Sequence, residues 1–162
     1  MILELKTIEI ILINCLGIPC VHVGISWLCQ QLPQDFFSRS ETTTRSKKSL
    51  FFYRKLLRIH RWKTHLPDAA PWLNGFPKSS LQSTHDKYLQ EFVAETRRGE
   101  FAHWLQWMII SLFVTWNPSP ACWIIIGYAA LMNAPCILNL RYTRIRLMAL
   151  LRKKEQSRNP SK

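Results

Sequence analysis

With 162 residues, the chain is long enough for one domain. Its formal net charge of +12 predicts an anionic partner, either a nucleic acid or an anionic lipid surface. The five cysteines are odd in number, form no Cys-x-x-Cys pair and lie inside apolar blocks, which argues against a disulfide framework and against a zinc site.

The first apolar block covers residues 10–29 and contains no Lys, Arg, Asp or Glu. About 20 apolar residues are enough for a helix to cross the hydrocarbon core of a bilayer. A cleaved signal peptide is the alternative, but the lead-in carries Glu4 and Glu9 against a single Lys6 and no small-residue cleavage site follows. We therefore predict a retained transmembrane helix, or an uncleaved signal anchor, within residues 1–29.

Residues 30–100 form a basic region with thirteen Lys and Arg residues. Within it, residues 50–63 have helical periodicity, with basic side chains on one face and apolar side chains on the other. That split is typical of a helix lying on anionic lipid, and a surface helix packed on its own domain is the equal alternative. The prolines of residues 66–80 predict a loop, and a helix resumes over residues 85–98. The basic face consists of Arg54, Lys55, Arg58 and Arg61.

Two further apolar blocks, residues 101–116 and 121–140, predict a transmembrane hairpin closed by the turn "NPSP". At 1.5 Å per residue the first of these blocks reaches only about 24 Å. We therefore expect its helix to begin earlier, within residues 95–100. This start places Glu100 and His103 at the level of the lipid headgroups.

The basic residues predict how the chain crosses the bilayer. Thirteen Lys and Arg lie in residues 30–100 and eight in residues 141–162, whereas the N-terminal lead has one and the "NPSP" turn has none. By the positive-inside rule, the middle region and the basic tail are cytoplasmic. The sequence thus predicts a mainly α, multi-pass protein of the cell membrane with about three transmembrane helices. The tail after residue 150 is expected to be frayed.

The stretch "ETRRGEFAHW" contains the best candidates for catalysis. Glu100 and His103 are spaced i, i+3 and share a helix face, and Glu95 lies about 80° away from His103 on the helical wheel. A carboxylate beside a histidine is the minimum for general base catalysis. The alternative is that the charged residues form interfacial ion pairs. A single Glu-x-x-His does not suffice for a di-iron site, so we expect no metal.

The last apolar block contains Asn133 and Pro135 at mid-membrane. The proline removes a helical hydrogen bond near Leu131, and the Asn133 side chain is expected to satisfy the freed group, with a substrate contact as the alternative. Beyond the block, Arg141 and Arg144 suit a phosphate or a lipid headgroup, or they only set the topology.

Three stretches of the chain resemble a known family. They are "RWKTHLPDAAPWLNGF", "ETRRGEFAHW" and "YAALMNAPCILNLRYTRIRL", and together they are similar to the bacterial glycosyl-4,4′-diaponeurosporenoate acyltransferases over about residues 50–150. Gly99 departs from the alanine expected there. The matching positions are Trp62, Lys63, Asp68, Glu95, Thr96, Arg98, Glu100, His103, Trp104, Asn133, Pro135, Arg141, Tyr142, Arg144, Arg146 and Leu147.

The resemblance implies transfer of a fatty acyl group to a sugar hydroxyl of a glycosylated carotenoid, or of a similar lipid-linked acceptor. We expect His103 to deprotonate the hydroxyl, with Glu100 or Glu95 orienting the ring. Arg98, or Arg141 with Arg144, is expected to stabilise the oxyanion or to hold a phosphate of the acyl donor. The expected substrate-binding residues are Asp68, Trp104, Asn133, Arg141 and Arg144.

The expected partners are membrane lipid, the lipid-linked acceptor and an anionic phospholipid surface. Nucleic acid is disfavoured because three apolar blocks make lipid the better polyanion. No cofactor is expected, and acyl-CoA is the candidate acyl donor. The alternative function is a non-enzymatic membrane protein that anchors or assembles a partner complex, in which case the same charges are ion pairs within the helical hairpin.

Overall fold

The computed structural model describes residues 5–38, 50–66, 75–78 and 80–159, and these residues form helices and connecting segments without a strand. The chain divides into two compact units. The first, called the apolar unit, consists of Met1–Gln31 and Gly99–Ile137. The second, called the basic unit, consists of Leu32–Arg98 and Leu138–Lys162. Lys6 is the single Lys or Arg of the apolar unit, so the basic unit carries nearly all of the positive charge.

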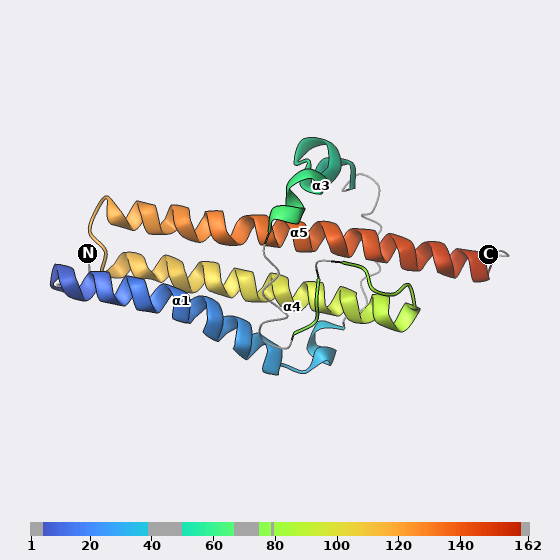
Figure 1. Ribbon diagram of the computed structural model, residues 1–162, viewed down its shortest axis with the longest axis horizontal. Coiled ribbons are helices and arrows are strands. Elements are labelled where there is room, and N and C mark those ends of the chain that lie inside the picture. The colour runs from blue at the N-terminus through green and yellow to red at the C-terminus, as the bar shows by residue number, and fades with distance from the viewer. Residues whose placement is uncertain (1–4, 39–49, 67–74, 79, 160–162) are drawn as a thin grey trace. The chain divides into compact units, whose positions relative to one another are not determined.

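The apolar unit is built from three helical segments. Helix α1 covers Thr7–Gln31, and it lies beside the C-terminal half of α4 (Asp86–Ser111), which continues as the 3₁₀ turn η5 (Leu112–Thr115) (Figure 1). After a turn, the N-terminal half of α5 (Ala121–Arg158) returns beside α4 (Figure 1). One cluster of buried side chains joins all three segments, and its buried members are Ile110, Phe113, Ile125 and Ala129.

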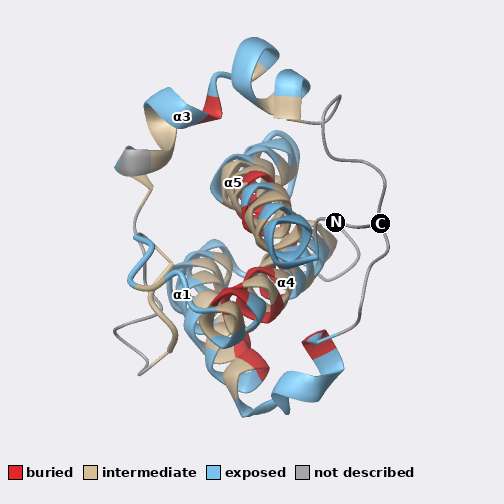
Figure 2. Ribbon diagram, turned by 90° about the vertical axis from the view of Figure 1, so that its right-hand side faces the viewer, coloured by how far each residue is buried: buried red, intermediate tan, exposed pale blue. Residues whose placement is uncertain are grey.

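Two of the described helices, α1 and α5, are long and apolar enough to cross a membrane, with mean hydropathies of 2.0 and 1.8 over their most apolar windows. Much of their surface is exposed, as Figure 2 shows for α1. Large apolar side chains such as Leu16, Trp123 and Leu131 are more than 60% exposed, which a soluble protein rarely allows in such number. The third crossing, predicted for residues 101–116, stays a prediction.

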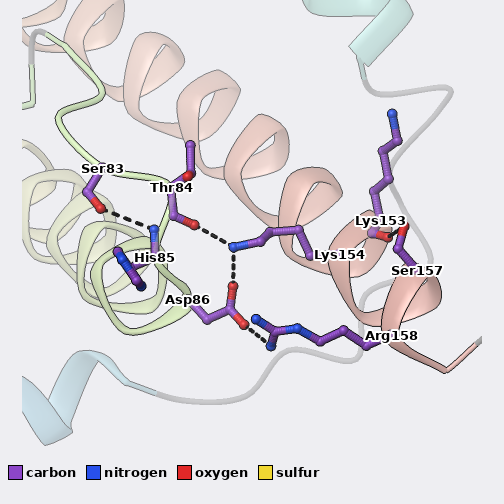
Figure 3. A network of polar contacts seen from close by, with 8 residues as sticks. All are labelled: Ser83, Thr84, His85, Asp86, Lys153, Lys154, Ser157 and Arg158. Carbon is purple, nitrogen blue, oxygen red and sulfur yellow. Dashed lines mark hydrogen bonds and ion pairs between the residues drawn. The ribbon is translucent and has the colours of Figure 1, made fainter.

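The basic unit contains the short helical turns η1 (Gln34–Phe37), η2 (Phe52–Leu56), α3 (Ile59–Trp62) and η3 (Lys63–His65) together with one end each of α4 and α5. Its core joins α4 to α5 through the buried side chains Leu89, Phe92 and Leu147. Figure 3 shows a polar network at the start of α4. There the Lys154 ammonium donates to the Thr84 carbonyl at 2.6 Å and to Asp86 at 2.5 Å, and Arg158 pairs with the second oxygen of Asp86.

The prediction of a single amphipathic helix over residues 50–63 is wrong. The segment is broken at Arg58, whose φ of 46° lies in the left-handed region, and the π turn η2 and the four-residue α3 lie on either side of it. Helical periodicity does not report such a break. As a result the apolar side chains separate, with Ile59 fully buried and Leu56 70% exposed.

The boundaries of α4 and α5 also differ from those predicted. Helix α4 runs unbroken through residues 86–111, so the helix of the second apolar block does begin upstream of residue 101, as expected. Helix α5 extends to Arg158, so the prediction of a frayed tail is wrong for residues 151–158. The contacts of Lys154 and Arg158 with Asp86 hold the last turns of α5 in place.

Candidate active site

His103 and Asn133 meet inside the apolar unit. His103 lies on α4 and Asn133 on α5, and Nδ1 of the ring is 3.0 Å from Oδ1 of the amide. Asn133 is fully buried, whereas His103 is half-buried. The Asn133 amide nitrogen donates to the carbonyl of Ala129 at 2.9 Å, rather than to the group freed near Leu131 as predicted. The structure thus brings Asn133 to the ring, and the orienting role of Glu100 or Glu95 stays a prediction.

Glu95 and Arg98, the other two predicted catalytic residues, lie in the basic unit. The Glu95 carboxylate is 5% exposed, and its oxygens face Arg98 at 2.6 Å and Lys78 at 3.4 Å. Arg98 also donates to the Leu32 carbonyl at 3.1 Å and lies over the ring of Phe37. A buried carboxylate between two cations is the arrangement expected of the ion-pair alternative.

The predicted substrate-binding residues belong to both units. Asp68 lies outside the described residues. Trp104 is 40% exposed and stacks on Trp107 with a ring separation of 5.4 Å, in the apolar unit. Arg141 and Arg144 are half-buried on the part of α5 that belongs to the basic unit. Of the described ones, none of Trp104, Asn133, Arg141 and Arg144 lines the cleft of about 780 Å³ that the basic unit forms between η1, α4 and the C-terminal part of α5.

A second histidine, His22 of α1, was not identified from the sequence. Its Nδ1 is 3.3 Å from Oε1 of Gln106, and its Nε2 is 3.3 Å from the hydroxyl of Tyr128. The Gln106 amide nitrogen donates to the His22 carbonyl and to Ser26. The signal that could have found this cluster was its isolated polar residues inside apolar blocks, because such residues need partners at membrane depth.

Within the described ranges, no group of three or more His, Cys, Asp or Glu side chains has the geometry to hold a metal ion. The His103–Asn133 pair has a different chemical capacity. A half-buried imidazole that is held by a neutral amide can accept a proton from a hydroxyl and pass it to a leaving group.

Comparison with known proteins agrees with this chemistry. The sequence profile of the glycosyl-4,4′-diaponeurosporenoate acyltransferase family matches residues 33–153. The glycosyl-4,4′-diaponeurosporenoate acyltransferase of Staphylococcus haemolyticus (strain JCSC1435) is 28% identical over 146 residues, covering 88% of this chain and 85% of that protein. The enzymes of the same name from Staphylococcus aureus strains bovine RF122 / ET3-1 and NCTC 8325 / PS 47 are each 27% identical, with 82% of both chains covered. No solved structure matches the chain significantly. The chain therefore belongs to the glycosyl-4,4′-diaponeurosporenoate acyltransferase family and is an acyltransferase.

Proposed function

We propose that this protein is a membrane-bound acyltransferase that transfers a fatty acyl group to a hydroxyl of a glycosylated carotenoid or a similar lipid-linked sugar. The observation that carries the proposal is the His103–Asn133 pair, which lies in the unit that also contains the apolar surfaces of α1 and α5. The relatives are named for a glycosylated carotenoid substrate, and an acceptor of that kind combines a bilayer-soluble chain with a polar sugar.

The proposed location is the cell membrane, crossed several times, with the basic unit on the cytoplasmic side. Its support is the charge division between the two units, because Lys and Arg are retained on the cytoplasmic side of a membrane. The hairpin turn then faces outward and the reaction takes place near the cytoplasmic headgroups. A sugar hydroxyl that lies at the interface reaches His103 there, while the carotenoid and acyl chains stay in the bilayer.

In the proposed reaction, Nε2 of His103 takes the proton of the acceptor hydroxyl as its oxygen attacks the carbonyl carbon of the acyl donor. With an acyl-CoA donor, the C–S bond breaks, and the proton held by His103 goes to the departing thiolate. The products are an ester and free CoA, so the reaction needs no metal or redox group. Arg141 and Arg144 are the groups proposed to hold the donor's phosphates, because guanidinium groups bind phosphate oxygens in pairs.

The test is product analysis with purified protein in detergent, using a glycosylated carotenoid and a long-chain acyl-CoA. Mass spectrometry should show a product heavier by one acyl chain. General acid–base catalysis contributes roughly 10²- to 10⁴-fold, so His103→Gln should lose that much turnover while staying folded. His85→Gln is the matched control, since His85 is exposed at the start of α4, and it should keep wild-type turnover. Full activity in His103→Gln would overturn the assignment of the base.

A further inference from the structure

The Asn133 side chain contacts two groups at once, and these contacts determine the orientation of its amide group. Its Nδ2 is 2.9 Å from the Ala129 carbonyl oxygen, and its Oδ1 is 3.0 Å from Nδ1 of His103. With the amide turned over, two carbonyl-type oxygens would face each other at 2.9 Å, with no hydrogen between them. Because Asn133 is fully buried, no water is at hand to relieve that repulsion. The amide oxygen must therefore point at the histidine.

An oxygen that faces Nδ1 can only accept, so Nδ1 of His103 must carry the proton. In a neutral ring the lone pair is then on Nε2. From this geometry we propose that Asn133 is a positioning residue that holds His103 in the tautomer a general base requires. The proposal rests on the proposed function, because it assigns the role of Nε2 in that reaction.

The choice of an amide in place of a carboxylate has a chemical consequence. A carboxylate at position 133 would also accept from Nδ1, but its charge would favour the imidazolium and raise the pKa of His103. A neutral amide fixes the tautomer without adding that charge. An Asn that orients a catalytic His also occurs in papain-like proteases, on an unrelated fold.

The apolar unit offers a matched pair for comparison. Gln106, one turn after His103 on α4, contacts His22 in the same manner. The amide nitrogen of Gln106 donates to the His22 carbonyl and to Ser26, and its Oε1 faces Nδ1 of His22. The Nε2 of His22 faces the hydroxyl of Tyr128. Gln106→Glu therefore makes the same amide-to-carboxylate change beside His22, a histidine to which the proposal gives no catalytic role.

The kinetic test compares the pH dependence of kcat/KM for wild type, Asn133→Asp, Asn133→Leu and Gln106→Glu. An opposite charge at this distance raises a histidine pKa by about 1–3 units, so Asn133→Asp should move the acid limb upward by that much and keep turnover above it. Asn133→Leu should lose turnover at every pH, because loss of the tautomer costs up to about 10⁴-fold in a comparable site. Gln106→Glu should leave the acid limb in place.

The other ionisable groups of the described helical part of the apolar unit stay unchanged in the Asn133 variants, so a shift belongs to position 133. They are Glu9, Cys15, Cys20, His22 and Cys29 on α1, Glu100 on α4, and Cys122, Tyr128 and Cys136 on α5. An acid limb at the same pH in Asn133→Asp and wild type would overturn the proposal, and so would a shift of equal size in Gln106→Glu. A purely structural role predicts less folded protein in both Asn133 variants and no shift.

A second readout does not depend on activity. Nitrogen-15 NMR of imidazole-labelled protein in micelles reports which ring nitrogen is protonated, and the His103 signals are identified by their loss in His103→Gln. Wild type should show a protonated Nδ1, and Asn133→Leu should show a mixture. A protonated Nε2 in wild type would overturn the proposal even with acyl transfer intact. Conversely, a protonated Nδ1 with no acylated product would refute the proposed function alone.

Discussion

The side-chain amides of Asn14 and Asn117 exchange two hydrogen bonds across a separation of 103 residues. Asn14 donates to Asn117 at 2.7 Å and Asn117 donates back at 3.1 Å, which joins the first half of α1 to the turn after η5. The indole of Trp116 adds a donor to Asn14 at 3.2 Å, and Asn117 also donates to the Phe113 carbonyl. The side chains of Asn14, Trp116 and Asn117 thus form one hydrogen-bonded group.

Replacing both amides should reveal that exchange as a coupling energy. In a bilayer protein, interhelical hydrogen bonds average about 0.6 kcal/mol and reach about 1.7 kcal/mol. Asn14→Leu and Asn117→Leu should each destabilise the protein, and the double variant should lose less than the sum by about that amount. Unfolding in mixed micelles, measured as a double-mutant cycle, checks the expectation. Strict additivity would show that the two amides do not act together.

Substitution of Gly17 by alanine should destabilise the protein, whereas the same substitution at Gly24 should not. A methyl group at Gly17 would meet the ring of the buried Phe113 at 3.0 Å, whereas a methyl group at Gly24 has nothing within 4 Å. Overpacking costs about 1–3 kcal/mol, while Gly→Ala in a helix gains roughly 0.5–1 kcal/mol. Gly24→Ala should therefore match or exceed wild-type thermal stability, and Gly17→Ala should melt below it. Equal melting temperatures for the two variants would contradict the close approach of α1 to Phe113.

Asp86 should make the stability of the basic unit depend on pH. The hydrogen bond from Lys154, with Arg158 beside it, holds the pKa of Asp86 below its usual value against the opposing effect of desolvation. Because the folded pKa is the lower one, the stabilisation is complete above the unfolded pKa of about 3.9 and is lost as pH falls through the folded pKa. Melting curves between neutral pH and pH 3 should show a decline for wild type that is smaller in Asp86→Asn.

The matched control for that experiment is Glu155→Gln, which changes an exposed carboxylate on the same part of α5. It should keep the wild-type pH dependence. Added salt should lower wild-type stability and leave Asp86→Asn less affected, because exposed ion pairs are screened within about 10 Å at 0.1 M ionic strength. An identical loss of thermal stability at low pH in wild type and Asp86→Asn would show that this network does not cause the pH dependence.

The segment around η2 should bind anionic lipid even though it is not one helix. Phe51, Phe52 and Leu56 are exposed alongside Arg54 and Lys55, so apolar and basic groups share the outer surface of this segment. Each basic residue near such a surface contributes about 1 kcal/mol. Changing Arg54, Lys55, Arg58 and Arg61 to Gln should expose the segment to protease in phosphatidylglycerol-containing proteoliposomes at low salt. Protection that is unchanged by these substitutions would count against lipid contact.

The helices could be predicted from the sequence because long apolar runs and the "NPSP" turn are local signals. The break at Arg58 could not, since a left-handed φ at a residue with a side chain depends on the packing of its neighbours, here the buried Ile59. The length of α5 could not be predicted from the sequence either. Its last turns depend on contacts with Asp86, about 70 residues earlier in the chain.

The candidate site shows the same limit. His103 was found because a histidine beside carboxylates at the edge of an apolar block is conspicuous. Helical spacing predicts partners only within a few positions of His103, but Asn133 lies 30 residues further along. His22 and Gln106 were missed for a related reason, because each is a lone polar residue until tertiary structure brings the two together.

The polar residues of α1 also bear on how the protein is made. Asn14 and His22 leave the ribosome first, but their hydrogen-bond partners are Gln106, Asn117 and Tyr128, far later in the chain. With the proposed membrane location, α1 enters the bilayer during synthesis with these groups unsatisfied or bound to water, because their partners are synthesised later. Chains truncated before Gln106 should consequently insert α1 less efficiently and be degraded faster than the full-length protein.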